Sequence, residues 1–153
     1  MSSDHELQNS RVIDYPRDLV WRAYEEPEHL TNWFGPKGFS STFQEFNFRT
    51  GGDWKFIFHG PDGKNYDNHN VFAEIKKPER VVFDHLSKPH IFRAEMMFEA
   101  MVSKTKLTFH MIHEKPIDER FRVFLLEKNE ENLDRLEAEL KRMTLLGRQK
   151  RKA

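Results

Sequence analysis

The chain contains no cysteine and has no net charge at neutral pH, and each absence excludes some classes of function. Without cysteine, disulfide bonds, thiolate nucleophiles and cysteine-ligated metals are excluded, as is usual for proteins of reducing compartments. The 25 Lys and Arg residues are balanced by 25 Asp and Glu residues, so no positive excess would hold a nucleic acid by long-range attraction. We therefore expect no nucleic-acid partner.

Long apolar runs are also missing. No stretch approaches the roughly 20 apolar residues that a membrane-spanning helix needs, and the polar first residues do not form a signal peptide. We predict a cytoplasmic protein without a membrane partner. A length of 153 residues suits one domain. We place a disordered N-terminus at 1–6, a single domain at 7–145 and a basic, flexible tail at 146–153.

Aromatic residues that alternate with other side chains predict antiparallel strands over the middle of the chain. Trp54, Phe56 and Phe58 follow the period of two that is typical of a strand, and Gly51-Gly52 and Pro61-Asp62-Gly63 supply turns on either side. Similar patterns predict further strands at 7–15, from 42 to 48, and at 66–76, 80–86, 92–101 and 106–113.

The helical period occurs near both ends of the chain. Pro16 and Pro27 delimit a first short helix, and a second follows at 28–34. A long helix at 117–143 carries an apolar stripe of Leu125, Leu126, Leu133, Leu136, Leu140 and Met143. This order predicts an α+β fold in which a curved antiparallel sheet wraps around the last helix, with two short helices after the first strand.

The alternation also predicts which side chains face this helix. We expect one apolar face from the pairs Phe98–Leu107, Met96–Phe109 and Ala94–Met111. In the preceding hairpin we place the buried face on Val71, Ala73, Ile75, Val81 and Phe83, with His69 and His85 at its ends.

The tryptophans and turn motifs resemble those of one known family. Their order and spacing are similar to those of the activators of the heat-shock-ninety chaperone ATPase, within the START and birch-pollen-allergen-like (SRPBCC) superfamily, over residues 11–142. The motifs are Trp21, Trp33, Gly51-Gly52, Pro61-Asp62-Gly63 and Pro78-Glu79-Arg80. The resemblance implies a helix-grip fold, and relatives that are often dimers imply that this chain forms a homodimer.

The resemblance also implies a cavity between sheet and last helix that holds a small lipophilic or amphipathic ligand. Asn129 occupies a helix position that is often Trp in the family, so we expect an apolar cavity with one polar anchor. The predicted ligand-binding residues are Trp33, Trp54, Phe56, Phe58, His69, Val71, His85, Met96, Phe98, Phe109, Met111, Leu125, Asn129 and Leu133.

Catalytic motifs are absent from the sequence. There is no nucleophile elbow or phosphate loop, and His110 and His113 would point to opposite faces of a strand. We therefore predict no catalytic residue, metal or cofactor, and a binding protein rather than an enzyme. Two alternatives stay open: a cyclase- or aromatase-like enzyme that uses His69, Glu74 or His85, and a protein-interaction module with a filled core that stimulates a chaperone ATPase.

Overall fold

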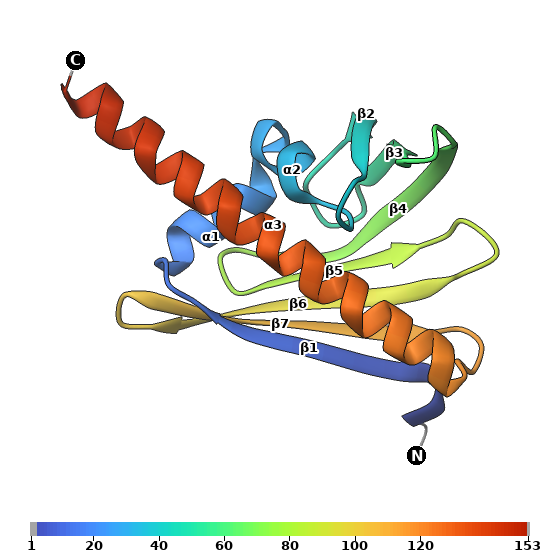
Figure 1. The fold of residues 1–153 in the computed structure, drawn as a ribbon. Helices are drawn as coiled ribbons and strands as arrows, with labels where there is room; N and C mark the ends of the chain where they lie inside the picture. Colours follow the sequence, from blue (N-terminus) through green and yellow to red (C-terminus); the bar gives the residue numbers. More distant parts are fainter. Residues whose placement is uncertain (1–2, 153) are drawn as a thin grey trace.

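The computed structural model describes residues 3–152, and the side chains of residues 4–147. Within them, a seven-stranded antiparallel sheet carries three α-helices (Figure 1). The elements in chain order are η1 (Ser3–His5), β1 (Glu6–Ile13), α1 (Arg17–Glu25), α2 (Pro27–Trp33), β2 (Ser40–Phe46), β3 (Asp53–His59), β4 (Asn65–Lys76), β5 (Arg80–His85), β6 (Phe92–Met101), β7 (Lys104–His113) and α3 (Glu119–Lys152). The predicted helix-grip architecture, with two short helices after the first strand, is confirmed.

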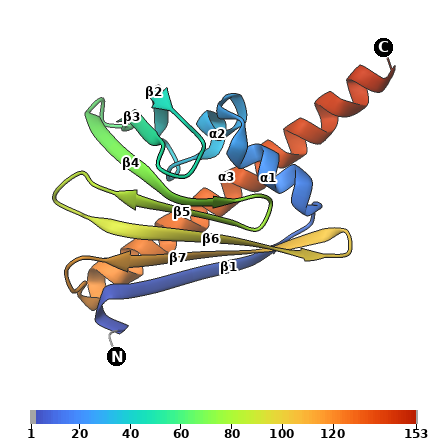
Figure 2. The ribbon, with the colours of Figure 1, turned by 180° about the vertical axis from the view of Figure 1, so that it is seen from behind.

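The sheet is a meander with one exception to sequential pairing. Strands β2 to β6 each pair with the next strand, and β1 pairs with β7, which gives the order β1-β7-β6-β5-β4-β3-β2. Helix α3 passes in front of the sheet in Figure 1 and behind it in Figure 2, where the opposite face carries no helix of the described chain. We call the face toward the helices the inner face and the other the outer face.

The predicted register between β6 and β7 is confirmed. The inward pairs are Ala94–Met111, Met96–Phe109 and Phe98–Leu107. On the outer face, His110 lies between two carboxylates, with Nδ1 3.1 Å from Glu95 and Nε2 2.8 Å from Glu6. Strict alternation along both strands therefore separates an apolar face from a charged one.

The prediction of which β4 side chains point inward is wrong before residue 73 and correct after it. A β-bulge leaves Ala73 unpaired, because Phe72 lies opposite Phe83 while Glu74 lies opposite Val82. An extra residue reverses which side chains point inward on its two sides. Before the bulge, Asn70 (1% exposed) and Phe72 (0% exposed) are therefore buried, whereas His69 and Val71 belong to the outer face.

The main core fills the space between the inner face and the three helices. The indole of Trp33 in α2 donates to the carbonyl of Ala23 in α1 at 2.9 Å, which locks the two short helices together. Buried residues of α3 join this core at Leu133, Leu136, Leu140 and Met143. A second apolar cluster lies under the first part of α3 and consists of Leu7, Met111 and Ile117 with Phe92, Phe109, Phe121, Leu125 and Leu126 around them.

Helix α3 is longer than predicted. It begins beside Asp118, whose carboxylate accepts from the backbone N–H of Phe121 at 2.8 Å, and it continues to Lys152. The expected tail from residue 146 is thus helical as far as Lys152, where the residues other than Gly147 have good helix propensity. At the other end, residues 3–5 form η1 and β1 begins at residue 6. None of the described helices is long and apolar enough to cross a bilayer.

Candidate functional site

Five inward-facing residues form one line across neighbouring strands. Each lies opposite the next in the strand pairing: Trp54, Asn70, His85, Phe92 and His113. They come from β3, β4, β5, β6 and β7 in turn, so the line crosses most of the sheet. We call this set the cross-strand row. It places three polar side chains and an indole N–H on a face that is otherwise apolar.

From Asn70 to His113, the side chains of neighbouring members of the row are in contact. The amide oxygen of Asn70 lies 2.7 Å from Nδ1 of His85. The ring of His85 stacks on Phe92 with 4.8 Å between centroids and 28° between planes. Phe92 in turn lies 5.2 Å from the ring of His113. The row therefore presents a run of flat rings with polar atoms along it.

Two nitrogen atoms of the row are buried without a hydrogen-bond partner in the described part of the chain. They are Nε1 of Trp54 and Nε2 of His113, whose residues are 0% and 5% exposed. Buried polar atoms are almost always paired, because leaving one unpaired costs about 1–3 kcal/mol. These two atoms point to a missing partner, which a water or a ligand could supply.

A hollow of about 440 Å³ adjoins the His113 end of the row. The lining comes from the β5–β6 loop, the segment after β7 and the start of α3: Pro89, His90, Ile91, His113, Glu114, Lys115, Pro116, Ile117, Asp118 and Phe121. A second hollow of about 610 Å³ lies elsewhere on the surface, and of the predicted ligand-binding residues only Phe98 lines it. His113 thus belongs to both the row and the nearer hollow.

The surroundings of the row favour the uncharged form of its two histidines, His85 and His113. Burial lowers the pKa of His85 to about 4, and the nearby His90, His113 and His69 contribute to the same shift. Burial also lowers the pKa of His113, helped by His90, Arg122 and His5. Both imidazoles are therefore uncharged at neutral pH, and each carries a single N–H.

Asn129 faces the sheet from α3, as predicted, and it already has protein partners. Its Nδ2 donates to Oδ1 of Asn9 at 3.0 Å and lies 3.5 Å from the sulfur of Met111. Asn9 also donates to the carbonyl of Leu126 and to the carboxylate of Glu130. This network fixes the first half of α3 against β1.

The other predicted ligand-binding residues fall into three groups. Deep in the main core or the second cluster are Trp33, Trp54, Phe56, Met96, Phe98, Met111 and Leu133. Phe58, Phe109 and Leu125 are partly exposed and pack against these clusters, and His85 is partly exposed within the row. On the outer face lie His69, whose Nε2 contacts Asp53 at 2.9 Å, and Val71.

Three members of the row were missed from the sequence. Phe92 and His113 continue the inward alternation of Ala94 and Met111, so the period of two could have identified them. Asn70 could not be identified in this way, because the bulge at Ala73 reverses its face.

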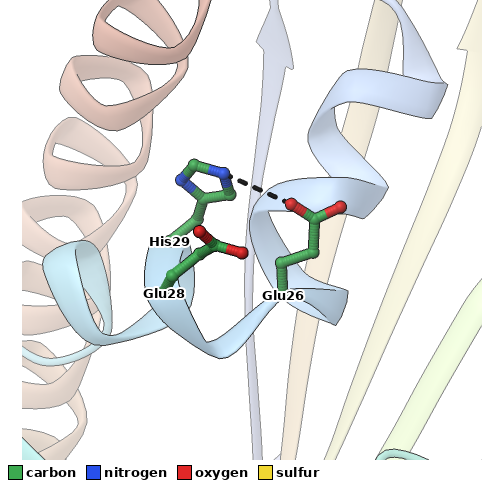
Figure 3. Close-up of side chains that lie close together, drawn as sticks. All are labelled: Glu26, Glu28 and His29. Atoms are coloured by element: carbon green, nitrogen blue, oxygen red, sulfur yellow. Dashed lines mark ion pairs between the residues drawn. The ribbon is translucent and has the colours of Figure 1, made fainter.

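A second group of titratable side chains connects α2 to α3. Ligand-type atoms of Glu26, Glu28 and His29 lie within 4.8 Å of one another, and Figure 3 shows the His29 ring turned toward Glu26. His29 bridges two carboxylates, with Nε2 3.3 Å from Glu26 and Nδ1 2.8 Å from Glu139. Burial raises the pKa of Glu139, but hydrogen bonds from Arg142, His29 and Asn32 outweigh it and hold that pKa below its usual value. We interpret the group as an ion-pair network that fastens α2 to α3.

The fold and the comparisons agree on the family. The model of the family described as "Activator of Hsp90 ATPase homolog 1-like protein" matches residues 14–141. The chain belongs to this family. No match is found among the curated proteins.

Solved structures share the fold of this family member at low sequence identity. A protein from Nitrosomonas europaea is 23% identical with a TM-score of 0.85, and the match covers 95% of this chain and 99% of that one. One from Arthrobacter aurescens is 22% identical with a TM-score of 0.80, covering 91% and 87%. The AHSA1 protein from Silicibacter pomeroyi is 18% identical with a TM-score of 0.74, covering 89% and 97%.

Proposed function

We propose that this family member binds a small, largely apolar molecule between the inner face of the sheet and the first half of α3, and that it does so without chemical turnover. The observation that carries the proposal is the pair of buried, unpaired nitrogens in the cross-strand row, Trp54 Nε1 and His113 Nε2. They lie at opposite ends of the row, four strand spacings of about 4.8 Å apart, so one small ligand reaches only one of them. A ligand with a polar group at His113 Nε2, the atom beside the hollow, would satisfy it while its apolar part contacts the aromatic rings around it.

The chemistry of the row favours binding over catalysis. A cyclase-like enzyme would need a general base, which in this setting is a histidine oriented by a carboxylate. His85 instead contacts the amide of Asn70, and among the described residues the row contains no carboxylate. The partly buried His29–Glu139 pair lies between α2 and α3, away from the row.

The test replaces Asn129 with Trp, which adds bulk between α3 and the sheet. We expect Asn129→Trp to remove binding of the neutral fluorescent probe Nile red and to remove any small molecule that native mass spectrometry detects on the purified wild type. Glu127→Trp adds the same ring to an exposed position of α3 and serves as the matched control. Unchanged probe binding in a folded Asn129→Trp protein would place the site elsewhere.

The family description provides a second candidate function, stimulation of an Hsp90-type ATPase. The first part of α3 carries two exposed apolar side chains, Val123 at 46% and Phe124 at 50%, which a protein partner could cover. The measurement is the ATPase rate of an Hsp90 chaperone with and without this protein. A rate increase that Phe124→Glu removes would support this function, and an unchanged rate would reject it.

A further inference from the structure

The contact between Asn70 and His85 determines which nitrogen of the imidazole carries its proton. The oxygen of a side-chain amide can only accept a hydrogen bond, so Nδ1 of His85, 2.7 Å away, is the donor. A neutral imidazole has one N–H, and Nε2 is therefore left with a lone pair. Within residues 3–152 no hydrogen bond to this Nε2 is found.

The surroundings keep this lone pair available. Burial opposes a positive charge on His85, and the nearby His90, His113 and His69 oppose it too, which together hold its pKa at about 4. No carboxylate in the row offsets them. At neutral pH the row therefore presents an acceptor at Nε2, next to the flat surface formed by the stacked rings of His85 and Phe92.

We infer that the site selects an un-ionised, ring-shaped ligand whose hydroxyl or N–H group donates to Nε2 of His85, and that it discriminates against carboxylates. The inference rests on the proposed function, because it concerns the ligand of that same site. A carboxylate would bring its own lone pairs against that of Nε2 and could pair with His85 only after the ring had taken up a proton. A hydroxyl needs no such change.

The test compares three probes that share one ring system: naphthalene, 2-naphthol and 2-naphthoic acid. At neutral pH the naphthol is un-ionised and the naphthoic acid is a carboxylate. Dissociation constants are measured by equilibrium dialysis of the wild-type protein. We expect 2-naphthol to bind about tenfold more tightly than 2-naphthoate, the effect of one buried hydrogen bond gained or lost.

Two variants test whether His85 causes the preference. His85→Phe keeps the stacked ring but removes the acceptor, so it should lose about tenfold in affinity for 2-naphthol and bind naphthalene as before. Asn70→Asp replaces the amide with a carboxylate that favours a protonated imidazole, which should reverse the preference toward 2-naphthoate. His59→Phe alters an outer-face histidine of β3 that contacts Thr42 and Asn65, and it is the matched control, with no expected change in any of the three affinities.

The outcomes separate this inference from the proposed function. If naphthalene and both derivatives fail to bind, the proposed site is wrong and the inference falls with it. If naphthalene binds but 2-naphthoate binds as well as 2-naphthol or better, the site stands and the inference is overturned. Circular dichroism verifies folding, and should His85→Phe fail to fold, the wild-type ratio and Asn70→Asp decide.

Discussion

Mild acid should destabilise this fold through His85. Burial, with additional repulsion from His90, His113 and His69, holds its pKa at about 4 in the folded protein, against about 6.5 in an unfolded chain. Between these values the unfolded chain binds a proton that the folded chain does not. Folding stability therefore falls as the pH decreases from 6.5 toward 4, and this residue adds little further loss below that.

The size of the effect follows from the shift. A difference of about 2.5 units, at 1.36 kcal/mol per unit, gives a loss of about 3 kcal/mol at pH 4. His85 is only partly buried, and solvent screening reduces the expected loss to roughly 1–2 kcal/mol. That is still a substantial part of the roughly 5–15 kcal/mol by which a typical domain is stable.

The assay is urea unfolding of the wild type and of His85→Gln at pH 7 and pH 4. Gln stays neutral throughout and can still hydrogen-bond to Asn70, so the variant should lose roughly 1–2 kcal/mol less than the wild type over this interval. Carboxylates and the other histidines titrate in both proteins and largely cancel in the comparison. His59→Gln alters a histidine whose contacts with Thr42 and Asn65 are exposed, and should behave as the wild type. Equal acid sensitivity in His85→Gln and the wild type would refute the reasoning.

Three further outcomes follow from single contacts. His113→Phe removes the unpaired Nε2 from an aromatic cluster, so urea unfolding should show a gain of about 1 kcal/mol, and a loss would mean that the nitrogen has a partner. Asn9→Ala removes the hydrogen-bond network between β1 and α3 and should lower the free energy of unfolding by about 2–3 kcal/mol. A decrease below about 0.5 kcal/mol would show that the network adds nothing to stability. A Cβ at Gly52 would lie 2.0 Å from the carbonyl oxygen of Asn47, so Gly52→Ala should cost at least about 3 kcal/mol. Gly51→Ala meets only an unfavourable positive φ and should cost about 1 kcal/mol in thermal unfolding, and equal costs at the two glycines would contradict this account.

The alternation of side chains along the sequence is enough to determine much of this protein. In β6 and β7 it correctly predicts the inward pairs Ala94–Met111, Met96–Phe109 and Phe98–Leu107, because the side-chain period of two holds along both strands without interruption. In α3 the helical period identifies Leu133, Leu136 and Leu140, all of which are buried against the sheet and the short helices. Periodicity is a local property, and the sequence alone is sufficient to determine it.

The place of Asn70 in the cross-strand row was decided only by the tertiary structure. The bulge at Ala73 turns Asn70 inward and His69 outward, and nothing in the local pattern indicates where an extra residue is accommodated. The contact between Asn70 and His85, and the burial that keeps His85 neutral, both depend on that bulge and on packing between distant segments. The sequence determined which elements form, because their periods are local. Only the assembled sheet determined which polar side chains meet on its inner face, because that depends on the register between strands.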